Sequence, residues 1–254
     1  MSRYPISRIE PSALSPLVTC PLRSWGDIPP PLRPQGAEVW LMTARYLEPY
    51  RSELERSLSD EERARCERFV RREDRERARL FRGALRRILA AYLDADPIEL
   101  QFSTSENGKP ALANDALAFN LSHSGDWLAV ACAREGDMGV DIEVRGRDLN
   151  PLDVANHSFC KSEAARLAEL PLPDQLPLFM KWWTAKEATL KAWGETLFSG
   201  VGSLDFSGWI AEPSIAFATA DATRWHAWRF ERRDVWGTIV TNHAIQRVTL
   251  RLAE

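Results

Sequence analysis

Apolar residues follow two different periods along the chain, and the change of period marks the predicted elements. Residues 37–43, 127–133 and 138–143 are short, mostly apolar runs next to turn residues, which is typical of buried strands. Between residues 60 and 93, a charged stretch carries apolar residues at steps of three and four. This spacing predicts a long helix with one buried face, ending before Pro97.

The same signals predict the remaining elements. Short strands are expected near residues 100–102 and 116–121, and helices near 152–155, 162–170 and 178–193. Strand signals return at residues 225–230, 235–241 and 248–252. The order strand, helices, strands therefore occurs over residues 37–134 and again over 135–254, which predicts an α+β protein of two similar halves.

Composition narrows the class of protein. Half of the 16 prolines lie in residues 1–36, which predicts an extended arm there rather than a domain. Of the 254 residues, 44% are hydrophobic, enough for a sizeable core, and the net charge of −3 argues against a general polyanion binder. We find no apolar run long enough to span a membrane, no signal peptide and no paired cysteines, so we expect a cytoplasmic protein with reduced thiols.

Two carboxylates, Asp141 and Glu143, alternate at the end of a predicted strand. Alternate strand residues share a face, so both carboxylates point the same way and Ile142 points to the core. Two carboxylates on one face repel each other unless a cation lies between them, and oxygen ligands suit Mg²⁺. A solvated strand end is the alternative.

A second acidic position lies on the predicted helix 178–193. Trp183, Glu187 and Lys191 are four residues apart and form one stripe. Three of the five lysines of the chain fall on this helix, and its flanks are apolar and aromatic. Buried acids and lysines need partners, and a metal with a phosphate would supply both. A surface Glu–Lys pair is the simpler alternative.

Residues 119–125 (F-N-L-S-H-S-G) lead from a strand into a predicted turn. Ser122 and His123 are adjacent, so in an extended chain they point to opposite faces and form a poor nucleophile–base pair. We therefore favour a phosphate-binding turn over a hydrolase site. A turn stabilised by its own side chains is the alternative.

Eleven arginines lie between residues 63 and 87, with acids interleaved. They predict a solvated, salt-bridged helix in which a few arginines bind phosphates of a small ligand. A nucleic-acid-binding helix is the competing interpretation, but no stacking platform accompanies it.

Taken together, these segments resemble the 4′-phosphopantetheinyl transferase superfamily, of the type that activates surfactin synthetase. Four motifs stand in the family's order, and the likeness runs from about residue 58 to residue 206. They are residues 107–110 (N-G-K-P), 119–124 (F-N-L-S-H-S), 138–143 (M-G-V-D-I-E) and 183–191 (W-T-A-K-E-A-T-L-K).

The resemblance implies a monomer with two halves related by a pseudo-twofold axis and with coenzyme A bound between them. It implies a Mg²⁺-dependent holo-[carrier-protein] synthase, which transfers phosphopantetheine to a serine of an apo acyl or peptidyl carrier protein and releases 3′,5′-ADP. Asp141, Glu143 and Glu187 would hold Mg²⁺, and Glu187 is also the candidate base. Lys191 would meet the phosphates with Lys109, Ser122 and His123, and Arg79, or else Arg77 or Arg82, would bind the 3′-phosphate.

Two other functions stay open at this point. A nucleic-acid-binding module would need a continuous, exposed arginine face. A non-catalytic relative that only binds carrier proteins would have lost a metal ligand, and all three acids are present.

Overall fold

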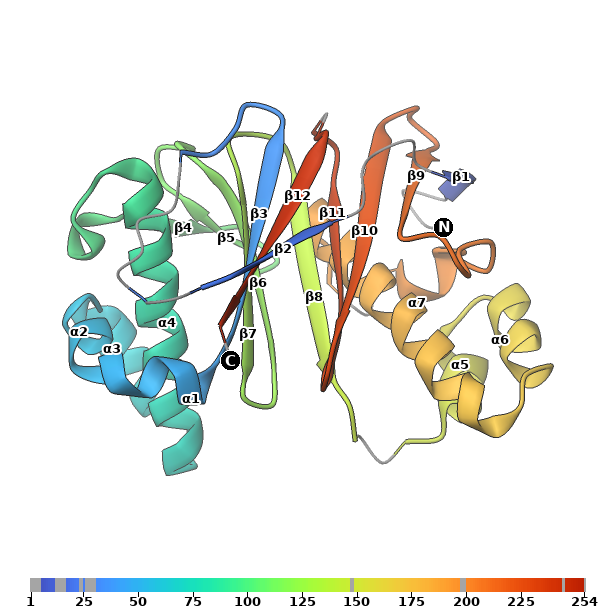
Figure 1. The fold of residues 1–254 in the computed structure, drawn as a ribbon, viewed down its shortest axis with the longest axis horizontal. Coiled ribbons are helices and arrows are strands. Elements are labelled where there is room, and N and C mark those ends of the chain that lie inside the picture. Colours follow the sequence, from blue (N-terminus) through green and yellow to red (C-terminus); the bar gives the residue numbers. More distant parts are fainter. Residues whose placement is uncertain are drawn as a thin grey trace.

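The computed structural model describes residues 6–11, 17–22, 25, 31–146, 149–196, 200–243 and 245–253. Two sheets lie face to face in the middle of the molecule, with one group of helices on each outer side (Figure 1). Alternate residues of both sheets, among them Val39, Ala129, Val140 and Ile239, fill the space between them. Among the described residues, no helix is long and apolar enough to cross a membrane.

The first half contains a sheet covered by α4 (Arg72–Leu93). Its other elements, in chain order, are β3 (Gly36–Thr43), α1 (Ala44–Leu47), α2 (Arg51–Arg56), α3 (Asp60–Glu67), β4 (Phe102–Thr104), β5 (Pro110–Leu112), β6 (Ala118–Ser124) and β7 (Trp127–Ala133).

The second half contains a sheet covered by α7 (Leu172–Trp193). Its other elements are β8 (Met138–Val144), α5 (Pro151–Ser158), α6 (Lys161–Ala168), β9 (Ser214–Thr219), β10 (Arg224–Arg232) and β11 (Val235–Thr241).

The two halves repeat one topology, which confirms the predicted α+β class. In the first half, β3 pairs with β7 and β7 with β6; in the second, β8 pairs with β11 and β11 with β10. Each half thus begins with a strand, continues through a long covering helix and returns as a hairpin whose last strand pairs with the first. The two halves are therefore similar in the order in which their strands and helices are connected.

The chain ends cross between the sheets. The last strand, β12 (Arg247–Ala253), lies parallel to β3 in the sheet of the first half, and β2 (Val18–Pro21) adds to it in parallel. The first strand, β1 (Ile6–Pro11), pairs with β9 in the other sheet. The predicted boundary at residue 134 therefore does not separate the two sheets, because each sheet contains strands from both sides of it. The described parts of the expected proline-rich arm supply an edge strand to each sheet.

The predicted helix 60–93 is two helices. Ser59 and Glu62 form a capping box that starts α3. Four residues separate the end of α3 at Glu67 from the start of α4 at Arg72. Asp94, in the left-handed region at φ 50°, ends α4 ahead of Pro97, which instead opens a 3₁₀ turn.

Other differences concern element ends. The predicted helix 178–193 begins earlier, at Leu172, because Pro177 lies inside it rather than at its start. The turn predicted at residue 122 is still strand, since β6 continues to Ser124. The prediction omitted β5, β9 and the helices between residues 44 and 56.

Candidate active site

Three carboxylates meet where α7 crosses β8. Asp141 and Glu143 are alternate residues of β8, and both residues are buried, with 2% and 6% of their surface exposed. Glu187 faces them from α7, and one oxygen of each of the three acids lies within 4.8 Å of the others. The structure thus brings together the three acids that the motifs singled out, and Ile142 points into the core between the sheets as expected.

Gly139 allows this close approach of helix and strand. A Cβ atom at position 139 would lie 2.5 Å from the backbone nitrogen of Ala192 and still closer to the carbonyl oxygen of Ala188. Backbone therefore packs against backbone at this point, one residue away from Glu187. The glycine of the G-V-D-I-E motif sets the distance between α7 and the two acids of β8.

The oxygens of Asp141 show that the site suits a cation. Its Oδ1 accepts hydrogen bonds from Lys191 Nζ at 2.7 Å and from Ser122 Oγ at 2.9 Å. Its Oδ2 is buried and accepts no hydrogen bond from the described residues. A buried carboxylate oxygen without a donor is costly, and a metal ion bound by the three acids would satisfy it.

Glu187 is strongly affected by this environment. Burial, followed by the charges of Asp141 and Glu143, raises the pKa of Glu187 to about 8, against the opposing effect of Lys191. At neutral pH and without a metal, the carboxyl group therefore tends to keep its proton. A divalent cation would reverse this balance, because it stabilises the ionised form.

We expect Glu187→Gln to change how stability depends on pH. The native state keeps the Glu187 proton up to about pH 8, whereas the unfolded chain loses it near pH 4.3, so this group lowers the free energy of unfolding as pH rises through that range. Glutamine does not titrate in this range, so the variant does not lose stability in this way. With EDTA present, the melting temperature of the variant should match wild type near pH 4 and exceed it near pH 8.

The exposed Glu169→Gln is the control for this measurement, because it removes a carboxylate outside the group of three acids. Excess Mg²⁺ should then stabilise wild type more than Glu187→Gln, because a ligand that binds only the native state raises its stability. Parallel profiles of melting temperature against pH for Glu187→Gln and wild type would contradict the raised pKa of Glu187.

Side chains of β6 hold β8 in place. Asn120 Oδ1 accepts a hydrogen bond from Val140 N at 2.9 Å, and Ser122 Oγ donates to Asp141. Ser124 Oγ donates to Glu143 Oε2 at 2.7 Å. Alternate residues of the F-N-L-S-H-S motif therefore join the edges of the two sheets and orient both acids. Ser122 is thus a partner of Asp141 on a strand, and the turn expected at this residue begins only at Gly125. The alternation of polar residues over 120–124 was the sequence signal for this role.

His123 points to the opposite face of β6, as adjacent strand residues must. Its ring lies 6.1 Å from that of Phe81 on α4. It lines a cleft of about 680 Å³ with Arg65, Arg77 and Arg82. Burial, then the charges of Lys191 and Arg77, lower the pKa of His123, so the free protein holds it mainly as neutral imidazole at pH 7. Because the side chains of Ser122 and His123 point to opposite faces of β6, the two residues cannot act as nucleophile and base.

Two predicted phosphate ligands lie elsewhere. Arg79 does not line the cleft, because its guanidinium pairs with Glu67 and lies 3.8 Å from Glu55 on the helix surface. The side chain of Lys109 reaches α7, where Nζ donates to the carbonyl of Ala192 at 2.9 Å. A cation at the C-terminal end of a helix stabilises it, so Lys109 has a structural role in this state.

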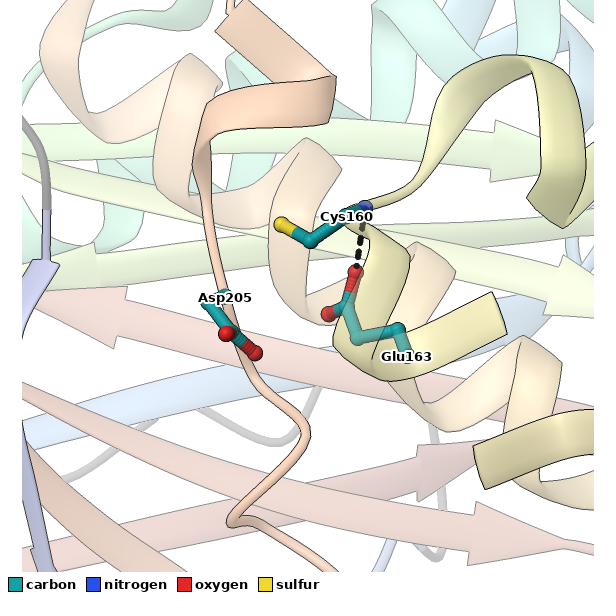
Figure 2. A group of neighbouring side chains, drawn as sticks. All are labelled: Cys160, Glu163 and Asp205. Atoms are coloured by element: carbon teal, nitrogen blue, oxygen red, sulfur yellow. Dashed lines mark hydrogen bonds between the residues drawn. The ribbon is translucent and has the colours of Figure 1, made fainter. Parts of the chain in front are cut away.

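Lys186 has a partner other than a phosphate. Its Nζ lies 2.7 Å from Glu163 Oε2, and both side chains are fully buried. Backbone N–H groups of Cys160 and Phe206 donate to the same carboxylate, and Cys160, Glu163 and Asp205 lie together (Figure 2). Hydrogen-bond donors already occupy the Glu163 carboxylate, so this second acidic group does not fit a metal ion. It instead holds helices of the second half together.

Known proteins resemble the chain along most of its length. A model of the 4′-phosphopantetheinyl transferase superfamily matches residues 137–246, and a model of the N-terminal region of 4′-phosphopantetheinyl transferases matches residues 47–135. The 4′-phosphopantetheinyl transferase HetI of Nostoc sp. is 34% identical over 178 residues, which cover 68% of this chain and 75% of HetI. The 4′-phosphopantetheinyl transferase Sfp of Bacillus subtilis is 34% identical over 142 residues, which cover 55% of this chain and 62% of Sfp. A phosphopantetheinyl transferase of Thraustochytrium sp. is 31% identical over 208 residues, or 75% and 72% of the two chains.

Proposed function

The chain belongs to the 4′-phosphopantetheinyl transferase superfamily, and on this basis we propose that it transfers the 4′-phosphopantetheine arm of coenzyme A to a serine of an apo acyl or peptidyl carrier protein. The reaction depends on Mg²⁺ and releases 3′,5′-ADP. The observation that carries this proposal is the group of three acids, in which the buried Oδ2 of Asp141 has no hydrogen-bond donor among the described residues.

Asp141, Glu143 and Glu187 would bind Mg²⁺, which draws negative charge from a pyrophosphate when bound. Ser122 and Ser124 orient the carboxylates of Asp141 and Glu143. Lys191, whose side chain is 30% exposed, adds a positive charge at the substrate side of the site.

The carrier serine would form a new bond from its oxygen to the β-phosphorus of coenzyme A, while the bond from that phosphorus to the oxygen of 3′,5′-ADP breaks. The serine proton passes to Glu187 or to a water that Glu187 orients. Catalysis of this kind depends on positioning and neutralisation of charge more than on covalent help from the protein. We assign the cleft to the nucleotide of coenzyme A, with Arg77, Arg82 and His123 as phosphate ligands in place of Arg79.

Mass spectrometry of an apo acyl carrier protein tests the proposal. Incubation with this chain, coenzyme A and Mg²⁺ should add the mass of one phosphopantetheine arm, and EDTA should prevent the addition. Persistent transfer in EDTA would contradict the metal requirement. Binding of the carrier protein without any mass gain would instead favour a non-catalytic relative.

The variant His123→Ala separates a phosphate ligand from a catalytic base. A hydrogen bond to a charged phosphate contributes about 1.5–3 kcal/mol, so we expect coenzyme A to bind roughly 10- to 150-fold more weakly to this variant. Turnover at saturating coenzyme A should be largely retained, because the attacking hydroxyl belongs to the carrier protein. Isothermal titration with coenzyme A and steady-state kinetics measure the two effects separately.

Phe81→Leu is the matched control, because it changes the neighbour of His123 and keeps the imidazole. It should affect coenzyme A binding much less than His123→Ala does. Loss of all turnover in His123→Ala at saturating coenzyme A would show that the imidazole takes part in the chemistry.

A further inference from the structure

Two exposed apolar residues lie side by side at the turn between α3 and α4. Phe69 is 48% exposed and Val70 is 93% exposed. Residues 65–71, here called the α3–α4 corner, also hold Arg65, Arg68 and Arg71, which are all exposed. The other exposed large apolar side chains of the described residues, Ile98, Leu172 and Ile210, stand singly in the sequence, whereas Phe69 and Val70 are adjacent and flanked by cations.

The three arginines of the corner differ from the other arginines of the run. Eight of the eleven arginines between residues 63 and 87 lie within 4.0 Å of a carboxylate: Arg63, Arg72, Arg75, Arg77, Arg79, Arg82, Arg86 and Arg87. The side chains of Arg65, Arg68 and Arg71 form no ion pair or hydrogen bond with any residue that the structure describes. The uncompensated positive charge of the run is therefore gathered at the corner.

The corner borders the cleft without belonging wholly to it. Arg65 and Phe69 line the cleft together with His123. Arg68, Val70 and Arg71 do not line it, so a ligand inside the cleft leaves them free. A macromolecule that contacts these three residues would lie at the mouth of the cleft.

The charge pattern favours an acidic protein over a nucleic acid. A nucleic-acid site needs a continuous basic face, and the paired acids Glu62, Glu67 and Glu76 interrupt the arginines along α3 and α4. The overall charge of −3 also opposes binding to a long polyanion. A small apolar tip with flanking arginines instead fits a protein surface with an apolar centre and an acidic rim.

We propose that the α3–α4 corner docks the carrier protein that supplies the acceptor serine. Val70 contacts an apolar residue of the carrier, and Arg68 and Arg71 pair with its carboxylates. This inference rests on the proposed transferase function and adds that the acceptor carries an acidic docking surface, which holds its serine at the mouth of the cleft.

Kinetics with an apo acyl carrier protein as the varied substrate test the inference. The double variant Arg68→Glu/Arg71→Glu should raise the KM for the carrier by about tenfold or more, because charge reversal turns attraction into repulsion. The turnover number and the KM for coenzyme A should stay near wild type, and the effect should shrink at high salt. Val70→Ser should raise the carrier KM by a few-fold and be insensitive to salt.

Arg233→Glu is the control, since Arg233 is also exposed but lies on the turn between β10 and β11. An unchanged carrier KM in the double variant and in Val70→Ser overturns the inference while leaving the proposed function intact. A rise in the KM for coenzyme A alone assigns the corner to the nucleotide instead. Salt-sensitive, nanomolar binding of duplex DNA that the double variant loses assigns it to nucleic acid. No transfer by the unaltered chain overturns the proposed function and this inference together.

Discussion

Alanine at Asp141, Glu143 or Glu187 is expected to lower phosphopantetheine transfer roughly 100- to 1000-fold, the range seen when one charge-stabilising group is removed from an active site. Each change removes one of three oxygen ligands from a single cation site. Mass spectrometry of the carrier protein, followed over time at saturating Mg²⁺, measures the loss.

The fold should survive each of these changes. Removing one acid relieves repulsion among the three, and Lys191, the partner of Asp141, is exposed enough to reach water. Circular dichroism and thermal unfolding in EDTA should therefore show native variants, and Glu169→Ala serves as the acidic control on the surface. Full activity of Asp141→Ala would remove Asp141 from the metal site.

Gly139→Ala is expected to impair stability and activity together. The added methyl group would collide with the backbone of α7 at Ala188 and Ala192, and backbone cannot rotate away as a side chain can. Overpacking of a core costs about 1–3 kcal/mol. Because the collision pushes α7 away from β8, Glu187 should move away from Asp141, and a displacement near 1 Å can cost about a hundredfold in rate.

Urea unfolding and the transfer assay measure the two effects of Gly139→Ala. Gly208→Ala is the control, since a Cβ atom there meets no other atom within 4 Å. It should change stability by no more than about 0.5 kcal/mol and leave activity unchanged. A Gly139→Ala protein with wild-type activity would show that the contact of α7 with β8 does not set the position of Glu187.

The central strands could be predicted from local pattern alone. Residues 127–133 and 235–241 form β7 and β11 with the predicted bounds, because a central strand buried on both faces is apolar along its whole length. Edge strands were harder. The edge strands β1 and β2 depend on partners more than 200 residues away, and so does the predicted strand β12 for its place beside β3. No local period reports such pairing.

For the candidate site, the alternation of Asp141 and Glu143 already placed both acids on one face, since a strand has a period of two. The sequence alone also led to the transferase family through four ordered motifs. It did not separate the two lysines of the W-T-A-K-E-A-T-L-K motif. Lys186 is buried against Glu163, whereas Lys191 reaches Asp141, and only the packing of α6 and β8 on opposite sides of α7 distinguishes them.

By itself, then, the sequence determined which residues carry charge, which faces of strands and helices they occupy, and to which family the chain belongs. The tertiary structure decided which charges meet. It turned Arg79 toward Glu67 and Lys109 toward the end of α7, and it made Ser122 and Ser124 the supports of two acids. The physical reason is that strand and helix periods act over a few residues, whereas these contacts join residues 12 to 83 positions apart in the chain. Their approach depends on close packing such as that at Gly139.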